Sequence, residues 1–326
     1  MLDFHVICSI PITMASISST YLKLSSSTLL PQHNSYRFAY ARRYDESYPA
    51  LFINPRQFRC STSQLWSWSP ASKTFLAPPR AAVVAADTLV RDAGATALVL
   101  SGAYAFVTAF DNIARRGSIP QSLSRKLVHI FSGLLFMASW PLFSTSMEAR
   151  YFAAIVPLTN CLRLLIHGLS LANNEALLKS VTRQGKPEEL LRGPLYYVLM
   201  LALCAVVFWR ESPVGVISLS MMCGGDGIAD IMGRKFGHVK LPYNQDKSWA
   251  GSISMFAFGF FISMGMLYYF SALGYFNLDW ALAVKRVALV SLVATAIESL
   301  PITKLMDDNI AVPIATMVMA YICFCL

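Results

Sequence analysis

Residues 223–252 read CGGDGIADIMGRKFGHVKLPYNQDKSWAGS and follow directly on an apolar run at 214–222. They carry two acids, Asp226 and Asp230, which are four residues apart and therefore lie on one face of a helix. A carboxylate deep in a bilayer costs about 2.5–3.5 kcal/mol on insertion scales, so an acid at such a position is a candidate functional residue. The stretch thus predicts a membrane helix that presents a functional pair of acids.

Small residues and bases follow the two acids. The glycines are Gly224, Gly225, Gly227, Gly233, Gly237 and Gly251, of which Gly224, Gly225, Gly233 and Gly251 are the expected ligand contacts, and the bases are Arg234, Lys235, Lys240 and Lys247. Carboxylates hold Mg²⁺, glycines let backbone N–H groups approach an anion, and bases neutralise phosphate charge. Because the stretch contains neither a Walker motif nor GxGxxG after a strand, it predicts a metal-chelated triphosphate site outside the soluble nucleotide-binding folds. Asp226 and Asp230 are the expected metal ligands, and either could instead accept the proton of an alcohol.

Lys247 and Ser248 come just before a strongly apolar segment that we expect to be a helix. The N-terminus of a helix offers free N–H groups and a positive dipole end to anions. We therefore expect Lys247 to bind the β- and γ-phosphates, together with Ser248 and Gly251, and Ser252 to act as a cap or a further contact. The alternatives are a lysine that extends to the membrane interface and an ordinary serine cap.

The composition indicates a membrane protein. Hydrophobic residues make up 55% of the 326-residue chain and charged residues 14%, and the mean hydropathy is +0.49. Apolar runs recur at close to the ~20 residues that span a bilayer. We expect an all-α, polytopic membrane helix bundle of about eight transmembrane helices, at residues 93–110, 127–146, 151–170, 195–210, 213–233, 252–273, 283–302 and 309–326.

The first 80 residues differ from the rest of the chain. They hold eight Lys or Arg but only three acids, and so supply +5 of the net charge of +9. This Ser-rich, acid-poor composition predicts a disordered plastid transit peptide at 1–80, with a mitochondrial presequence as the alternative, and a membrane-embedded domain at 81–326. Since the remaining bases form no stripe with interleaved aromatic residues, nucleic-acid binding is not expected.

Positive charge alternates between the loops. The loops after the first, third and fifth predicted spans have net charges of +3, +1 and +3, whereas those after the second and fourth are balanced. The positive-inside rule places the three basic loops on one side, the stromal side in a plastid. That side would also receive the loop after the seventh span. One face would then hold Asp226, Asp230, Arg125, Lys126, His129, Arg192, Lys247, Asp307 and Asp308.

Several of these residues have two interpretations. Arg125 and His129 share a helix face and, with Lys126, form a candidate phosphate site, although a histidine at a span end is often structural. Arg192, before Gly193-Pro194, is a second candidate for phosphate binding.

Two acids near the C-terminus are also candidates. Asp308 could ligate a metal or cap a helix. For Glu298 we favour a pair with Arg163 inside the bundle, and the alternative is a place in the site beside Asp307 and Asp308.

Several stretches together carry a resemblance to a known family. They are GGDGIADIMGRKFG, KLPYNQDKSWAGS, LSRKLVHIFSGLLF, RGPLYYVL and ESLPIT, and the likeness runs from about Asp92 to the C-terminus. The chain resembles the polyprenol kinase family, and within it the plastid phytol kinases. The resemblance implies transfer of the terminal phosphoryl group of a nucleoside triphosphate, typically CTP, to an isoprenoid alcohol such as phytol. It also implies a chloroplast membrane location and a product used in tocopherol synthesis, and it favours phosphate binding by Arg125, Lys126 and His129.

Three other functions stay open at this point. The alcohol could be farnesol or geranylgeraniol, which the spans do not discriminate. The reaction could be nucleotidyl transfer that forms a CDP-lipid, as in the distantly similar phosphatidate cytidylyltransferases. A non-enzymatic alternative is an ion-coupled transporter with Asp226 and Asp230 as its ion site, but it leaves the bases of 234–247 without a role.

Overall fold

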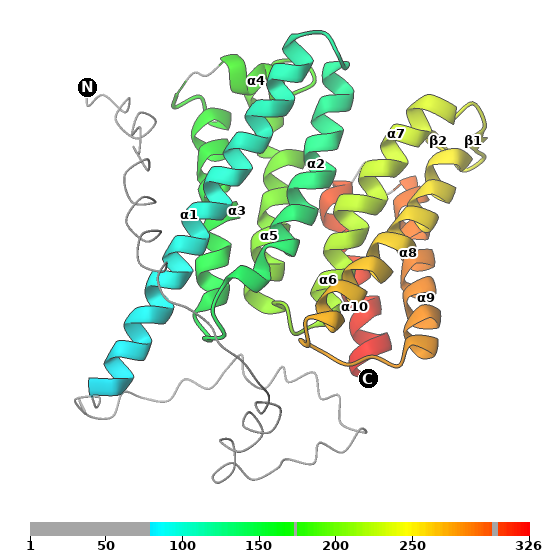
Figure 1. Cartoon of the computed structure of the whole chain (residues 1–326). Helices are drawn as coiled ribbons and strands as arrows, with labels where there is room; N and C mark the ends of the chain where they lie inside the picture. The colour runs from blue at the N-terminus through cyan, green and yellow to red at the C-terminus, as the bar shows by residue number, and fades with distance from the viewer. Residues whose placement is uncertain (1–78, 173–174, 302–305) are drawn as a thin grey trace, which may run out of the picture. The chain divides into compact units, whose positions relative to one another are not determined.

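A computed structural model describes residues 79–172, 175–301 and 306–326, so all but the last two residues of the predicted transit peptide lie outside the described residues. The described ranges confirm the all-α prediction, since their only sheet is a two-stranded hairpin (Figure 1). The longer helices are α1 (Pro79–Arg115), α2 (Gln121–Ala138), α3 (Ala149–Gly168), α5 (Gly193–Val207), α7 (Gly227–Phe236), α8 (Trp249–Ala272), α9 (Trp280–Ser299) and α10 (Asp308–Cys325). Shorter elements are η3 (Trp140–Leu142), α4 (Glu175–Val181), η4 (Pro187–Leu191), α6 (Pro213–Leu219), η5 (Ser220–Asp226), β1 (Lys240–Leu241) and β2 (Asn244–Ser248).

Among the described residues, seven helical segments are long and apolar enough to cross a membrane. Each overlaps one of the predicted spans. The remaining predicted span, at 127–146, corresponds to α2, a helix of 18 residues. Because the first turns of α2 carry Arg125, Lys126 and His129, its hydropathy is lower, yet it packs along α1 and α7 within the same bundle.

The span that carries the two predicted acids lies at the centre of the packing. It runs without interruption through α6, η5 and α7, from Pro213 to Phe236, and every residue of α6 and η5 is buried. A Cβ atom on Gly225 would lie 3.3 Å from the Cα atom of Gly259, so small residues let η5 and α8 approach closely. The η5 segment is π-helical, a local widening that is frequent at functional sites, and it ends at Asp226.

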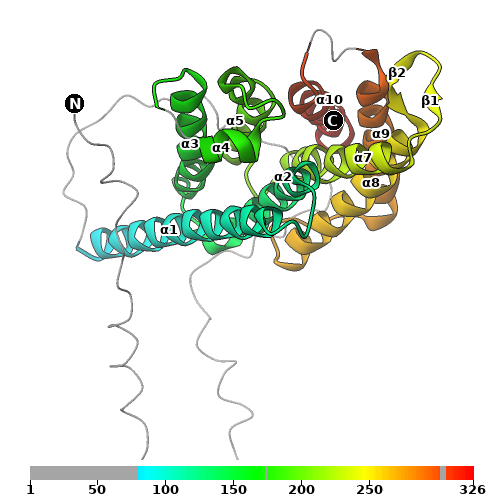
Figure 2. The ribbon, with the colours of Figure 1, turned by 90° about the horizontal axis from the view of Figure 1, so that it is seen from above.

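Two groups of helices can be followed in Figure 2. On one side α3 packs against α5, and on the other α7, α8, α9 and α10 pack around η5, while α1 contacts both α3 and α2. The β1–β2 hairpin leads directly into α8, and its last strand places Lys247 beside the end of α9 and the start of α10.

Candidate active site

A cavity of about 1900 Å³ lies between these two groups of helices. All of the predicted site residues line it except Gly224 and Gly225. The lining also includes residues from the loops that the charge pattern assigned to one face, among them Arg115, Arg183, Arg192 and Lys240. The loops that the charge pattern assigned to one face thus contribute to a single cavity within the described part of the chain.

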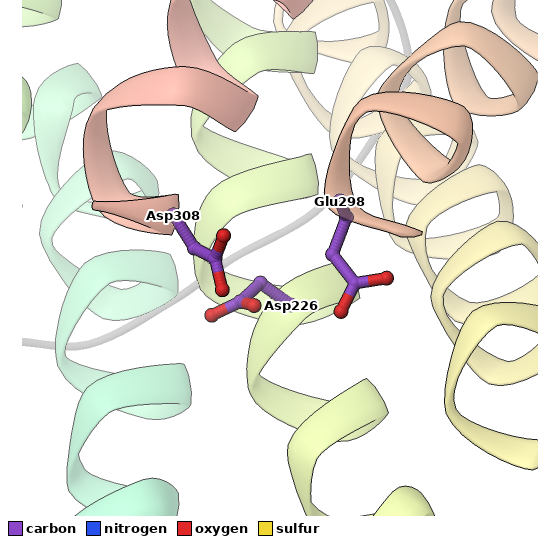
Figure 3. Close-up of side chains that lie close together, drawn as sticks. All are labelled: Asp226, Glu298 and Asp308. Carbon is purple, nitrogen blue, oxygen red and sulfur yellow. The ribbon is translucent and has the colours of Figure 1, made fainter. Parts of the chain in front are cut away.

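Three carboxylates from distant segments meet at the polar end of this cavity (Figure 3). Asp226 ends η5, Glu298 lies near the end of α9 and Asp308 begins α10, and each offers an oxygen within 4.8 Å of the others. Asp226 and Glu298 are only 8% and 4% exposed. In the part of the chain that the structure describes, Glu298 Oε2 is buried without a hydrogen-bond partner. Buried carboxylates require cations, and we call these three residues the three-carboxylate cluster.

Lys247 supplies one cation to the three-carboxylate cluster. Its ammonium donates to Glu298 Oε1 and lies 2.9 Å from Asp308 Oδ2. Burial lowers the pKa of this ammonium, but the carboxylates of Glu298, Asp308 and Asp226 outweigh burial and raise the pKa above its usual value. The ammonium therefore stays charged at neutral pH. When the three carboxylates are ionised, one ammonium leaves negative charge that a divalent cation would balance.

The second predicted acid, Asp230, has different partners. Arg234, one turn further along α7, donates to Asp230 Oδ1 from Nε at 3.1 Å and from Nη2 at 3.0 Å. Lys126 stands between the two predicted acids, with its Nζ 3.4 Å from Asp230 Oδ2 and 4.0 Å from Asp226 Oδ2. Both acids thus line one cavity, but Asp230 belongs with Arg234 and Lys126, which we call the Asp230 cluster.

The glycines of the motif bring helices together. A Cβ atom on Gly224 would lie 2.5 Å from Ile262 Cδ1 of α8, so Gly224 faces α8. A Cβ atom on Gly233 would lie 3.7 Å from the Cα atom of Gly251, where α7 meets the first turn of α8. Gly233 and Gly251 also line the cavity, so close packing and access to a ligand coincide there.

The start of α8 differs from the prediction in one detail. Ser248 caps the helix, because its Oγ accepts a hydrogen bond from the Gly251 N–H at 3.2 Å. The cap is therefore one turn earlier than Ser252, which the sequence offered for this role. Ser252 lines the cavity, and its buried Oγ has no hydrogen-bond partner among the described residues. Of the two predicted roles for Ser252, a ligand contact is the one that this geometry leaves.

Among the basic residues of α2, some contacts hold helices together, while the side chains also line the cavity. Arg125 donates from Nη1 to the Thr182 carbonyl oxygen at 3.0 Å and so ties α2 to the segment after α4. The His129 ring lies against the Tyr197 ring, tilted by 36° with the centroids 4.1 Å apart, and its buried Nε2 has no hydrogen-bond partner within the described ranges. Arg192 precedes α5 and lines the same cavity.

The preferred prediction for Glu298, an ion pair with Arg163, is wrong. Glu298 pairs with Lys247, whereas Arg163 lies on α3 and lines another part of the cavity. Lys247 and Glu298 are 51 residues apart in sequence, so no local spacing could join them. The alternative prediction placed Glu298 in the site beside Asp307 and Asp308. Its signal was an acid at the end of one predicted span followed by acids at the start of the next.

Comparison with known proteins gives a consistent result. Over 239 residues the chain is 66% identical to a soybean (Glycine max) protein described as probable phytol kinase 1, chloroplastic, which covers 73% of this chain and 79% of the relative. It is 65% identical over 241 residues to phytol kinase 1, chloroplastic, of Arabidopsis thaliana, covering 74% and 79%. It is 60% identical over 243 residues to a probable phytol kinase 1, chloroplastic, of Oryza sativa subsp. japonica, covering 74% and 77%. No family model and no solved structure matches the chain.

Proposed function

The chain belongs to the chloroplast phytol kinase family, and from this membership we propose that it transfers the terminal phosphoryl group of CTP, or a related nucleoside triphosphate, to phytol. It is a multi-pass chloroplast membrane protein. The observation that carries the proposal is the buried three-carboxylate cluster, which shares one cavity with the bases Lys126, Arg192 and Lys247. Acids for a metal and bases for phosphate are what triphosphate chemistry requires.

The residues of the cluster fit Mg²⁺. Asp226, Glu298 and Asp308 supply oxygen ligands, the donor type that Mg²⁺ prefers, and Glu298 Oε2 has no other partner among the described residues. When bound there, the ion would neutralise charge on the phosphate oxygens during transfer. This set differs from the ligands expected from sequence, because Glu298 replaces Asp230 beside Asp226 and Asp308.

The chain's own bases hold the triphosphate. Lys247 contacts Glu298 and Asp308 in this structure, so a metal ion on those carboxylates would release its ammonium for the β- and γ-phosphates. Lys126 lies between Asp226 and Asp230 and can offset the charge that develops during transfer. Asp230 fixes the position of Lys126 and Arg234 through its contacts with both.

At the γ-phosphorus the reaction forms one bond and breaks one, and a proton leaves the hydroxyl group. The oxygen of phytol bonds to the γ-phosphorus, the bond between that phosphorus and the β–γ bridging oxygen breaks, and the nucleoside diphosphate leaves. The hydroxyl proton passes to a carboxylate of the cavity, for which we propose Asp226. We further propose that the product, phytyl phosphate, supplies tocopherol synthesis.

A labelling experiment tests this proposal. The protein, purified in detergent with Mg²⁺, is incubated with phytol, farnesol or geranylgeraniol and with each of the four nucleoside triphosphates labelled at the γ-phosphorus. We expect label in phytyl phosphate, most rapidly with phytol and CTP, and none with an Asp226→Asn control. Label in pyrophosphate with cytidine on the lipid would establish a cytidylyltransferase instead. Ion flux into sealed vesicles that contain the protein, without triphosphate consumption, would establish a transporter.

A further inference from the structure

The cavity has a second, apolar end that the phosphate chemistry does not use. Its lining there comes from α1, α2, α3 and α5, in particular Val99, Ala103, Leu135, Phe136, Val156 and Leu201. We call these six residues the apolar arm. A cavity for one drug-sized ligand has about 300–1,000 Å³, so a cavity of about 1900 Å³ has room for a second molecule beside a nucleotide.

The apolar arm is continuous with the polar end along α2. His129 and Ser132 line the cavity near the acids, and Leu135, Phe136 and Ser139 line it further along the same helix. Ten residues separate His129 from Ser139, a distance of roughly 15 Å at 1.5 Å per residue. A long ligand could thus place one end at the acids and extend along α2.

The walls of the apolar arm are fixed, whereas its rim is open. Phe136, Val156 and Leu201 are 5%, 8% and 5% exposed, because α3 packs closely on α5 and α2 packs on the central span. Leu98 and Leu135 at the rim are 61% and 53% exposed. Since these helices lie within a bilayer, the rim opens towards hydrocarbon, and an apolar molecule could reach the acids from the side.

Gly102 marks free space on the α1 wall. It lines the cavity, and a Cβ atom added there would meet no atom within 4 Å. Gly102 is exposed, so a larger side chain at this position would occupy open space beside the cavity lining without displacing a neighbour. Gly94, on the same helix, also has nothing within 4 Å but does not line the cavity.

We propose that the apolar arm binds the isoprenoid chain of the alcohol, with its hydroxyl at the acids, and that Gly102 on α1 sets the space available to that chain. This inference rests on the proposed function, since it assigns the second substrate of the same site to named residues. The arm offers apolar contact along its length, whereas the triphosphate needs the bases at the other end.

The test compares Gly102→Phe with the matched control Gly94→Phe. Binding of phytol to the detergent-purified protein is measured by competition with radiolabelled phytol and without nucleotide. We expect the Kd of Gly102→Phe for phytol to rise about tenfold or more, as when two or three methylene-sized groups lose apolar contact. The Kd of Gly94→Phe should equal that of the wild type. Steady-state kinetics should show a raised KM for phytol, a smaller change for the ten-carbon geraniol and an unchanged KM for the triphosphate.

Unchanged phytol binding in Gly102→Phe, or equal losses for phytol and geraniol, would overturn the proposal. If Gly102→Phe fails to accumulate, Gly102→Leu takes its place, with a smaller loss in the same direction expected. Because binding is measured without nucleotide, it tests the arm even if the wild type transfers no phosphoryl group. That latter result would instead refute the proposed function.

Discussion

The two charged groups that share the polar end of the cavity are built in opposite ways. The Asp230 cluster joins Asp230 to Arg234 one turn away on the same helix, and the Arg234 side chain is 45% exposed. The three-carboxylate cluster draws on η5, α9 and α10, with Lys247 added from β2, and two of its acids are almost completely buried. Local spacing produces the Asp230–Arg234 pair, to which the tertiary fold adds Lys126 from α2, whereas the second group depends on the tertiary fold alone.

This difference in construction predicts a difference in function. Exposed ion pairs contribute about 0–1 kcal/mol, so proteins gain little stability from them. Burying several like charges is costly, and Lys247 balances only part of the charge of the three-carboxylate cluster. A costly arrangement without an evident structural benefit points to chemistry. The substitutions below therefore separate the two groups, from the largest expected effect to the smallest.

Asp226→Asn should have the largest effect. Asp226 belongs to the three-carboxylate cluster and also lies 4.0 Å from Lys126, so its loss affects both the metal ligands and the phosphate-binding bases. Losing several kcal/mol of transition-state stabilisation corresponds to roughly 1,000-fold or more in kcat. The measurement is kcat in detergent with saturating phytol and triphosphate, at matched protein levels and Tm. A variant that retains most of its turnover would remove Asp226 from the site.

Glu298→Gln tests the residue whose partner the sequence analysis predicted wrongly. The amide keeps the shape of the side chain but removes its charge, so we expect the Mg²⁺ concentration for half-maximal activity to rise and kcat/KM to fall about 100-fold. The control is Arg163→Gln. If Glu298 served only as an internal partner of Arg163, the two variants would have similar kinetics. The contact between Glu298 and Lys247 leads us to expect that they differ widely.

The sequence predicted most of the fold and the residues of the site, but less of the way they pair. Apolar length located the spans, because a bilayer sets that length whatever the packing. Alternating loop charge predicted that Arg192, Lys247 and Asp308 lie on one face. The contact between Lys247 and Glu298 could not be predicted, since it depends on how the β1–β2 hairpin places β2 against the end of α9. Likewise, the sequence allowed Gly224 either to contact a phosphate or to let a neighbouring helix approach, and only the packing of α8 shows which contact it makes.

Lys247→Ala should lower activity to an intermediate extent and should affect the triphosphate more than phytol. Charged hydrogen bonds are worth roughly 1.5–3 kcal/mol, so we expect about a 10- to 100-fold loss in kcat/KM for the triphosphate and little change in KM for phytol. Lys247→Arg should recover only part of this loss, because a planar guanidinium does not reproduce a compact ammonium. Since Lys247 competes with a cation for Glu298 and Asp308, Lys247→Ala should also bind Mg²⁺ more tightly without nucleotide. Calorimetry measures that affinity, and weaker Mg²⁺ binding would contradict the competition.

The smallest effects are expected in the Asp230 cluster. Asp230→Asn frees Lys126 and Arg234 but leaves the three-carboxylate cluster intact, so we expect kcat/KM to fall only about tenfold, as on loss of one charged hydrogen bond. Arg234→Gln should lower it less, because the Arg234 side chain is 45% exposed and its pair with Asp230 is screened by solvent.

A double-mutant cycle between these two positions measures the strength of their pair. Exposed i,i+4 pairs are worth about 0.3–0.5 kcal/mol, so the coupling in kcat/KM should be about twofold. The control cycle combines Glu298→Gln with Lys247→Ala, whose buried pair should couple more strongly. If Asp230→Asn instead lowered activity as far as Asp226→Asn, the two acids would act as one unit. In that case the spacing of four residues in the sequence, and not the long-range cluster, would define the metal site.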